Sequence, residues 1–165
     1  MESTDTPKVS VILRGQNDWR AWYDNIKTTA KSRQIWHLID PTLTAPPLEP
    51  SPPVEPGFHL VKSGIRSVTE FSSEDYDVWK RLTKEFDRKS AQYEKNLRNL
   101  NAIKTLIRSS IARYYYYYIY EKPNIFEEIK TLYNRFSTSD IERQKELRKR
   151  YFELQKIFKS TDIDI

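Results

Sequence analysis

The stretch that most constrains the fold is Gly15 to Pro41, which holds three of the chain's four tryptophans. Asp18 can serve as the N-cap of a helix here. The apolar residues that follow recur at the i, i+3, i+4, i+7 and i+11 positions of one helical face: Trp19, Trp22, Tyr23, Ile26 and Ala30. The apolar pattern continues through Ile35, Trp36 and Ile39. It stops where the residue before Pro41 is driven out of the α region. We therefore predict a Trp-rich first helix whose indoles form the centre of a core.

The composition excludes several classes of protein. At 165 residues the chain has room for one domain of ordinary size. It has no cysteine and only two histidines, so disulfides and thiolate metal sites are excluded. No apolar run approaches the roughly 20 residues of a membrane span, and the first residues lack the pattern of a signal peptide. We expect a soluble intracellular protein that binds no membrane.

Residues 41–57 contain seven of the nine prolines, a density that forbids helix and favours an extended chain. We interpret this segment as a stiff surface linker. An alternative is a ligand for a proline-recognising domain, because Pro47-Leu48-Glu49-Pro50 and Pro50-Ser51-Pro52-Pro53 fit P-x-x-P.

Residues 1–9 are polar and predicted to be disordered, and Val11 and Leu13 permit a short extended lead-in.

A second helix is predicted to open at Ser72 or Ser73, with Glu74 and Asp75 at its positive end. Large apolar side chains recur every seven residues, at Trp79, Phe86, Tyr93, Leu100, Ile107 and Tyr114. A continuous helix over 74–121 would be roughly 70 Å long, which exceeds a compact domain of this size. We therefore predict a break near Ser109–Arg113, with Asn99–Asn101 as an earlier alternative.

Five consecutive tyrosines at Tyr114, Tyr115, Tyr116, Tyr117 and Tyr118 cannot share one helical face. Either the segment is a turn wrapped by its neighbours or some of the rings are exposed. Exposed tyrosines suit a protein–protein interface, which we predict here, and they could also stack on bases.

Two further helices complete the pattern. The first carries its apolar face on Ile125, Phe126, Ile129, Leu132, Tyr133 and Phe136. The second follows a capping box at Ser139-x-x-Glu142. Its apolar residues are predicted to face the core: Ile141, Leu147, Tyr151, Leu154 and Phe158.

The whole net charge of +5 lies in residues 74–165, which contain 20 Lys and Arg and 15 Asp and Glu. Residues 1–73 contain 8 basic and 8 acidic residues, so their net charge is zero. This excess permits weak, salt-sensitive contact with RNA. The candidate RNA contacts are Arg81, Arg88, Arg143, Lys145, Arg148, Lys149 and Arg150. The alternative is that these residues form the solvated sides of amphipathic helices.

The first stretch also matches a longer pattern, L-x-G-x-N-x-W-x-x-W-x-x-x-I-K-x-x-A followed by I-W-x-x-I-D-P. The residues that carry it are Leu13, Gly15, Asn17, Trp19, Trp22, Ile26, Lys27, Ala30, Ile35, Trp36, Ile39, Asp40 and Pro41. This stretch resembles the amino-terminal Gag (capsid) region of copia-type LTR retrotransposons, in particular the fungal ones. Nine of its residues are the expected signature core: Leu13, Gly15, Trp19, Trp22, Ile26, Ala30, Trp36, Ile39 and Pro41.

The resemblance implies that Leu13 to Gly15 pack beneath the first helix and that residues 125–136 close the bundle. It also implies that the polypeptide continues past residue 165. We expect the following organisation: 1–9 disordered, 10–40 lead-in and first helix, 41–72 proline-rich linker, 73–160 remaining helices, and 161–165 an open end left by truncation.

The chain carries no recognisable catalytic arrangement. It has three glycines and no phosphate loop, and G-x-S-x-G, H-E-x-x-H and D-[ST]-G are all missing from the sequence. We interpret the carboxylate pairs Glu127-Glu128 and Asp162/Asp164 as solvated charge. Without cysteine a zinc knuckle cannot form. We predict no enzyme activity, no cofactor, no bound metal and no small-molecule substrate.

These observations predict an all-α fold, an amphipathic bundle of four to five helices with a proline-rich extended insertion after the first. The resemblance implies a structural function: self-association into virus-like particles that package retrotransposon RNA, in the cytoplasm or also in the nucleus. On this hypothesis Trp19, Trp22, Trp36 and Trp79 hold the domain. The alternative is a monomeric nucleic-acid-binding or adaptor module derived from such a Gag fragment.

Overall fold

The computed structural model describes residues 11–137 and 140–161, and in the last helix it describes the side chains of residues 142, 144–145 and 147–156. This part of the chain is mostly helical, with five α-helices and no strand, so the all-α prediction is confirmed. The α-helices are α1 (Gln16–Ser32), α2 (Ser73–Ser109), α3 (Arg113–Tyr116), α4 (Ile125–Phe136) and α5 (Asp140–Thr161). Three short 3₁₀ helices lie between α1 and α2: η1 (Trp36–Leu38), η2 (Phe58–Leu60) and η3 (Val68–Glu70).

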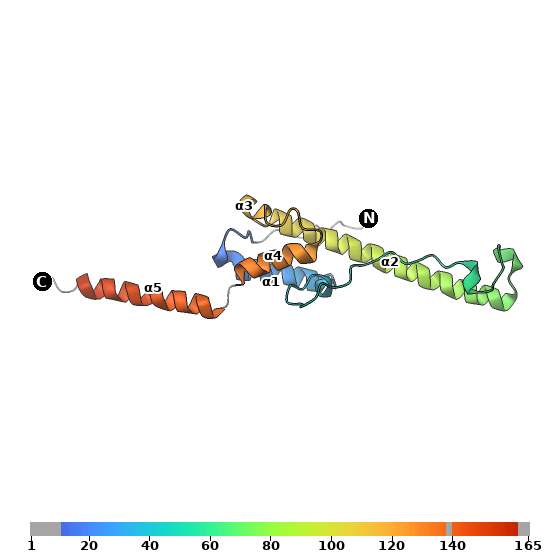
Figure 1. The fold of residues 1–165 in the computed structure, drawn as a ribbon, viewed down its shortest axis with the longest axis horizontal. Coiled ribbons are helices and arrows are strands. Elements are labelled where there is room, and N and C mark those ends of the chain that lie inside the picture. Colours follow the sequence, from blue (N-terminus) through green and yellow to red (C-terminus); the bar gives the residue numbers. More distant parts are fainter. Residues whose placement is uncertain (1–10, 138–139, 162–165) are drawn as a thin grey trace.

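Helices α1, α4 and the carboxyl-terminal part of α2 gather into one group (Figure 1). The rest of α2 and the whole of α5 project from this group in opposite directions (Figure 1). The core lies where the three helices meet, and the lead-in segment and the turn after α3 complete it. Its buried side chains are Leu13, Trp19, Trp22, Ile26, Ala30, Ile35, Ile39, Ile103, Leu106, Ile107, Ile111, Ile119, Ile125, Ile129, Leu132 and Phe136.

Helix α1 is shorter than the apolar pattern predicts. Gly15 is its N-cap, ahead of the predicted cap Asp18, whose carboxylate instead accepts a hydrogen bond from the Arg14 amide at 3.0 Å. The helix ends at Ser32 because Gln34 adopts a left-handed backbone with φ 62°. The amides of Gln34 and Ile35 then bond back to the last turn at 2.9 and 3.0 Å, which is a Schellman motif without its usual glycine.

Helix α2 begins at Ser73, where the sequence predicts its start, and it opens with a capping box that the sequence analysis did not name. The Ser72 side chain accepts from the Asp75 amide, and the Asp75 carboxylate accepts from the Ser72 amide. The helix ends at Ser109, inside the predicted break. It runs without interruption past Asn99, so the alternative break at Asn99–Asn101 is wrong. The Asn99 side chain donates to the Arg33 carbonyl oxygen at 3.1 Å and so links the end of α1 to α2.

The segment between η1 and α2 contains no α-helix. It leaves the bundle, follows α2 to its projecting end and turns back there through η2 and η3 (Figure 1). At that end Trp79 packs against Phe58 and Phe71, with ring centroids 4.8 and 5.9 Å away. Trp79 therefore does not join the core that contains Trp19 and Trp22. It holds a separate aromatic cluster at the tip of α2.

Helix α5 does not face the core. Leu147, Tyr151 and Leu154, which the pattern placed toward the core, are all exposed, and no described side chain of α5 is buried. The helix leads away from the carboxyl end of α4 (Figure 1). Amphipathic spacing shows which side of a helix is apolar, but it does not show which surface that side packs against. Ser139 and the side chains of Ile141 and Phe158 lie outside the described residues.

Candidate interaction surfaces

Most of the signature residues form the core, as the sequence predicted. Leu13, Trp19, Trp22, Ile26, Ala30, Ile39 and Pro41 are buried. Gly15 and Trp36 are only half-buried. The Trp36 indole donates to Asp40 Oδ2 at 3.0 Å. Burial opposes ionisation of Asp40, but hydrogen bonds from Thr42 and Trp36 outweigh it and lower the pKa of that carboxyl.

The lead-in segment bonds to the residues that follow the carboxyl end of α2, in addition to lying beside α1. Leu13 forms an isolated parallel bridge with Ile111: its amide donates to the Ser110 carbonyl oxygen at 2.8 Å, and its carbonyl accepts from the Ala112 amide at 2.9 Å. Ser110 is fully buried and its hydroxyl accepts from the Trp22 indole at 2.8 Å. Sequence analysis did not single out Ser110, because a serine at a predicted helix break carries no sign of burial.

The tyrosine run forms both a turn and an exposed surface. Ile119 is fully buried and anchors the segment in the core, while Tyr115 is half-buried and packs edge-on against Phe136 at 4.9 Å. The other rings are exposed, and we call them the tyrosine surface: Tyr114, Tyr116, Tyr117, Tyr118 and Tyr120. Tyr117 is the most open, with 73% of its surface exposed.

Two arginines hold the tyrosine surface in place. The Arg135 guanidinium of α4 lies 4.1 Å from the centre of the Tyr118 ring and 5.9 Å from that of Tyr115. Arg108 of α2 lies 5.6 Å from the centre of the Tyr116 ring. Such contacts stabilise by about 0.5–1 kcal/mol each where water has access. Within the tyrosine surface, Tyr116 and Tyr118 thus each have an arginine packed on the ring.

Arg108 also belongs to a buried ion pair that the sequence interpretation missed. Its Nη2 donates to Glu128 Oε1 at 2.6 Å, and Glu128 is fully buried. The hydrogen bond to Glu128 raises the pKa of Arg108. The interpretation of Glu128 as solvated charge is wrong. The signal that could have found it is spacing, because Glu128 lies three residues after Ile125 and four before Leu132, on the apolar face of α4.

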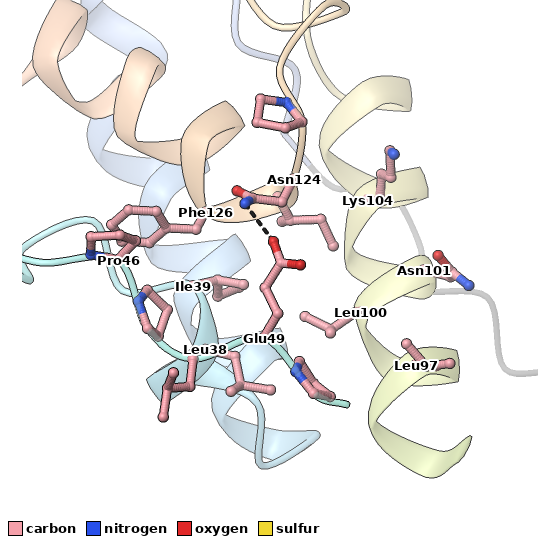
Figure 2. A pocket seen from close by; sticks show the side chains of 15 residues that line it. Leu38, Ile39, Pro46, Glu49, Leu97, Leu100, Asn101, Lys104, Asn124 and Phe126 are labelled. Atoms are coloured by element: carbon pink, nitrogen blue, oxygen red, sulfur yellow. Dashed lines mark hydrogen bonds between the residues drawn. The ribbon is translucent and has the colours of Figure 1, made fainter. Parts of the chain in front are cut away.

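A cavity of about 270 Å³ lies between the proline-rich segment, α2 and the start of α4. We call it the pocket. Figure 2 shows the side chains that line it, among them Leu38, Ile39, Pro46, Glu49, Leu97, Leu100 and Phe126. One wall is held by Asn124, whose Nδ2 donates to Glu49 Oε1 at 2.6 Å while its Oδ1 caps α4. The P-x-x-P motif at Pro47–Pro50 thus lies against the helices and lines this pocket.

The structure does not bring the predicted RNA contacts together. Arg81 and Arg88 lie on the projecting part of α2, whereas Lys145, Arg148, Lys149 and Arg150 are exposed on α5, at the other end of Figure 1. Arg88 is already bonded to Glu85 at 2.8 and 3.0 Å, and this contact lowers the pKa of Glu85 to about 2. The side chain of Arg143 lies outside the described residues.

Among the side chains that the structure describes, no group of three or more histidines and carboxylates could hold a metal ion. No described helix is long and apolar enough to cross a membrane.

Comparisons with protein-family models, with curated proteins and with solved structures find no match for this chain. The resemblance to copia-type Gag therefore depends on the residues of Leu13 to Pro41.

Proposed function

We propose that this chain is a non-catalytic capsid protein, similar to the amino-terminal part of copia-type Gag, which self-associates into virus-like particles and packages element RNA. The observation that carries the proposal is the tyrosine surface. Five rings at one end of the bundle are exposed although the core beside them is closed, and arginines pack on two of them, Tyr116 and Tyr118. On this proposal the particles form in the cytoplasm, and the chain has no cofactor.

The physical chemistry of the tyrosine surface favours a protein partner. A tyrosine ring supplies a large apolar area at low conformational entropy cost, and its hydroxyl remains satisfied at a wet rim, so tyrosine is enriched at interfaces. Several hydroxyls already have partners within the chain. Tyr114 donates to the Arg14 carbonyl oxygen, and Tyr120 donates to Glu121 Oε1 at 2.5 Å. Another copy can therefore cover these two rings without leaving their hydroxyl groups unpaired.

Substitution within the tyrosine surface tests the proposal. We expect the triple variant Tyr116→Ser/Tyr117→Ser/Tyr118→Ser to shift assembly of the purified chain to at least tenfold higher concentration, as measured by light scattering. Tyr115 stays unchanged, because it packs on the core. The matched control is Tyr76→Ser, which alters an exposed tyrosine on the projecting end of α2. If the triple variant and the control assemble alike, the tyrosine surface is not the contact.

The alternative function, a monomeric nucleic-acid-binding or adaptor module, draws on one observation. The basic side chains of α5 are exposed, and those at Lys145, Arg148, Lys149 and Arg150 all lie on a single projecting helix. A helix of this kind can neutralise phosphates, with an affinity that falls steeply with salt. A monomer at every concentration that retards RNA, and loses this retardation when the four residues become alanine, would favour this function over the capsid proposal.

A further inference from the structure

Helix α5 carries an apolar ridge that nothing in the described chain covers. Leu147, Tyr151 and Leu154 recur at i, i+4 and i+7 and so share one side of the helix. Their exposed fractions are 58, 61 and 54%. Most helical stability in proteins comes from packing an apolar face against other structure, and no described side chain of the 22-residue helix α5 is buried. The ridge therefore requires a surface to pack against.

Pairing of two α5 helices does not provide that surface. Arg148 and Arg150 lie three residues and one residue before Tyr151, which places them on the two flanks of the ridge. Two α5 helices packed ridge to ridge would bring these arginines close to their counterparts, and like charges at such positions destabilise the pair. A surface that suits the ridge is apolar and has no excess of positive charge at its edge.

The pocket has these properties. Its rim carries two exposed leucines, Leu48 from the proline-rich segment and Leu97 from α2. Its charged lining residues are one carboxylate and one amine, Glu49 and Lys104, so their charges cancel. Further apolar side chains of the lining come from η1, α2 and α4: Leu38, Leu100 and Phe126 (Figure 2). Large apolar side chains of the ridge can enter this space, with an α5 arginine beside Glu49.

The course of the chain favours a pocket in a different molecule. The pocket lies at the amino end of α4, where Asn124 and Phe126 line it, whereas α5 follows the carboxyl end. The 12 residues of α4 separate the two ends by roughly 18 Å. From there α5 leads away from the bundle (Figure 1).

We propose that the ridge of α5 in one copy docks in the pocket of a second copy. This inference rests on the self-association proposed above and names a contact separate from the tyrosine surface. Because ridge and pocket are different surfaces, each copy offers one of each, and the contact is head to tail. A head-to-tail contact continues from copy to copy until it closes into a ring or extends into a filament.

A mixing experiment tests this contact with three double variants. The ridge variant is Leu147→Gln/Leu154→Gln, and the pocket variant is Leu48→Gln/Leu97→Gln. All four leucines are exposed, so the fold should be retained, and circular dichroism of each variant is the check. The control is Lys149→Gln/Lys156→Gln, with the same new residue and the same seven-residue spacing on the other side of α5.

We expect the ridge variant and the pocket variant each to assemble only at concentrations at least tenfold above that of the unaltered chain and of the control, in sedimentation velocity. A 1:1 mixture should then form species that contain both variants and exceed the size of either alone. This follows because the intact pocket of the ridge variant accepts the intact ridge of the pocket variant. Beyond this pair the contact cannot propagate.

The other outcomes overturn the inference. If either variant assembles as the unaltered chain does, α5 or the pocket is covered by something else, such as its own chain or another protein. If both are defective but their mixture gains nothing, the two surfaces do not meet. A monomeric unaltered chain would refute the proposed self-association itself, and that result is distinct from both.

Discussion

Replacing Arg108 by methionine tests whether the buried ion pair fastens α4 to the end of α2. Arg108 lies in the last turn of α2 and Glu128 in the first turn of α4, so each charge is also favoured by the dipole of its helix. Their hydrogen bond is 2.6 Å long. The second carboxylate oxygen of Glu128 has no hydrogen-bond partner in the described part of the chain. The variant Arg108→Met therefore leaves a buried carboxylate without its cation.

The magnitude follows from the surroundings of the pair. Removing one member of a buried ion pair destabilises a protein by about 3–5 kcal/mol, because the other charge stays buried and uncompensated. The side chain of Arg108 is 28% exposed, so water can reach the site after the change, and we expect a loss near 3 kcal/mol. The double variant Arg108→Met/Glu128→Leu removes both charges at similar volume. We expect it to lie within about 1 kcal/mol of the unaltered chain.

Urea unfolding followed by tryptophan fluorescence measures both free energies of unfolding, at protein concentrations below assembly. The single variant should have the lower midpoint, and the second substitution should restore most of it. The reasoning would be refuted by a single variant that loses less than about 1 kcal/mol, the range of exposed pairs. It would equally be refuted by a double variant as unstable as the single one.

Three further predictions concern hydrogen bonds seen in the structure. Ser110→Ala leaves the buried indole nitrogen of Trp22 without its acceptor, so we expect a loss of about 1–3 kcal/mol in urea unfolding. The pKa of the Asp40 carboxyl is lowered in the folded chain, so the ionised carboxylate stabilises the fold above about pH 4, and this stabilisation is lost as the pH falls through the folded-state pKa. Asp40→Asn, which also weakens the contact with Trp36, should therefore make the free energy of unfolding less dependent on pH in this acid range. Asn124→Ala removes the cap of α4 and should lower the free energy of unfolding by about 1 kcal/mol, whereas Asn124→Ser should keep the cap without setting a second carboxylate beside Glu49.

Local sequence patterns sufficed where a helix carries its own boundary signals. Ser72 and Asp75 form the capping box that opens α2, and Asn124 caps α4, whose apolar face is the predicted one. The end of α1 had no such signal, because the left-handed position is filled by Gln34 and not by glycine. A non-glycine residue there is held by the surrounding hydrogen bonds, which depend on the completed fold.

The candidate surfaces depended on contacts between distant segments, and sequence spacing does not reveal these. The seven-residue series through Trp79 predicts an apolar side of α2, yet two different sets of neighbours cover it along its length. The burial of Glu128 becomes intelligible only when the end of α2 brings Arg108 to it. The pattern of α5 likewise predicted a ridge but assigned it to the core of its own chain.

The most direct test of self-association is light scattering of the purified chain over a concentration series, with and without RNA. The capsid proposal predicts growth into large uniform particles above a threshold concentration, and RNA should lower that threshold. A chain that stays monomeric at every concentration, with or without RNA, would contradict it.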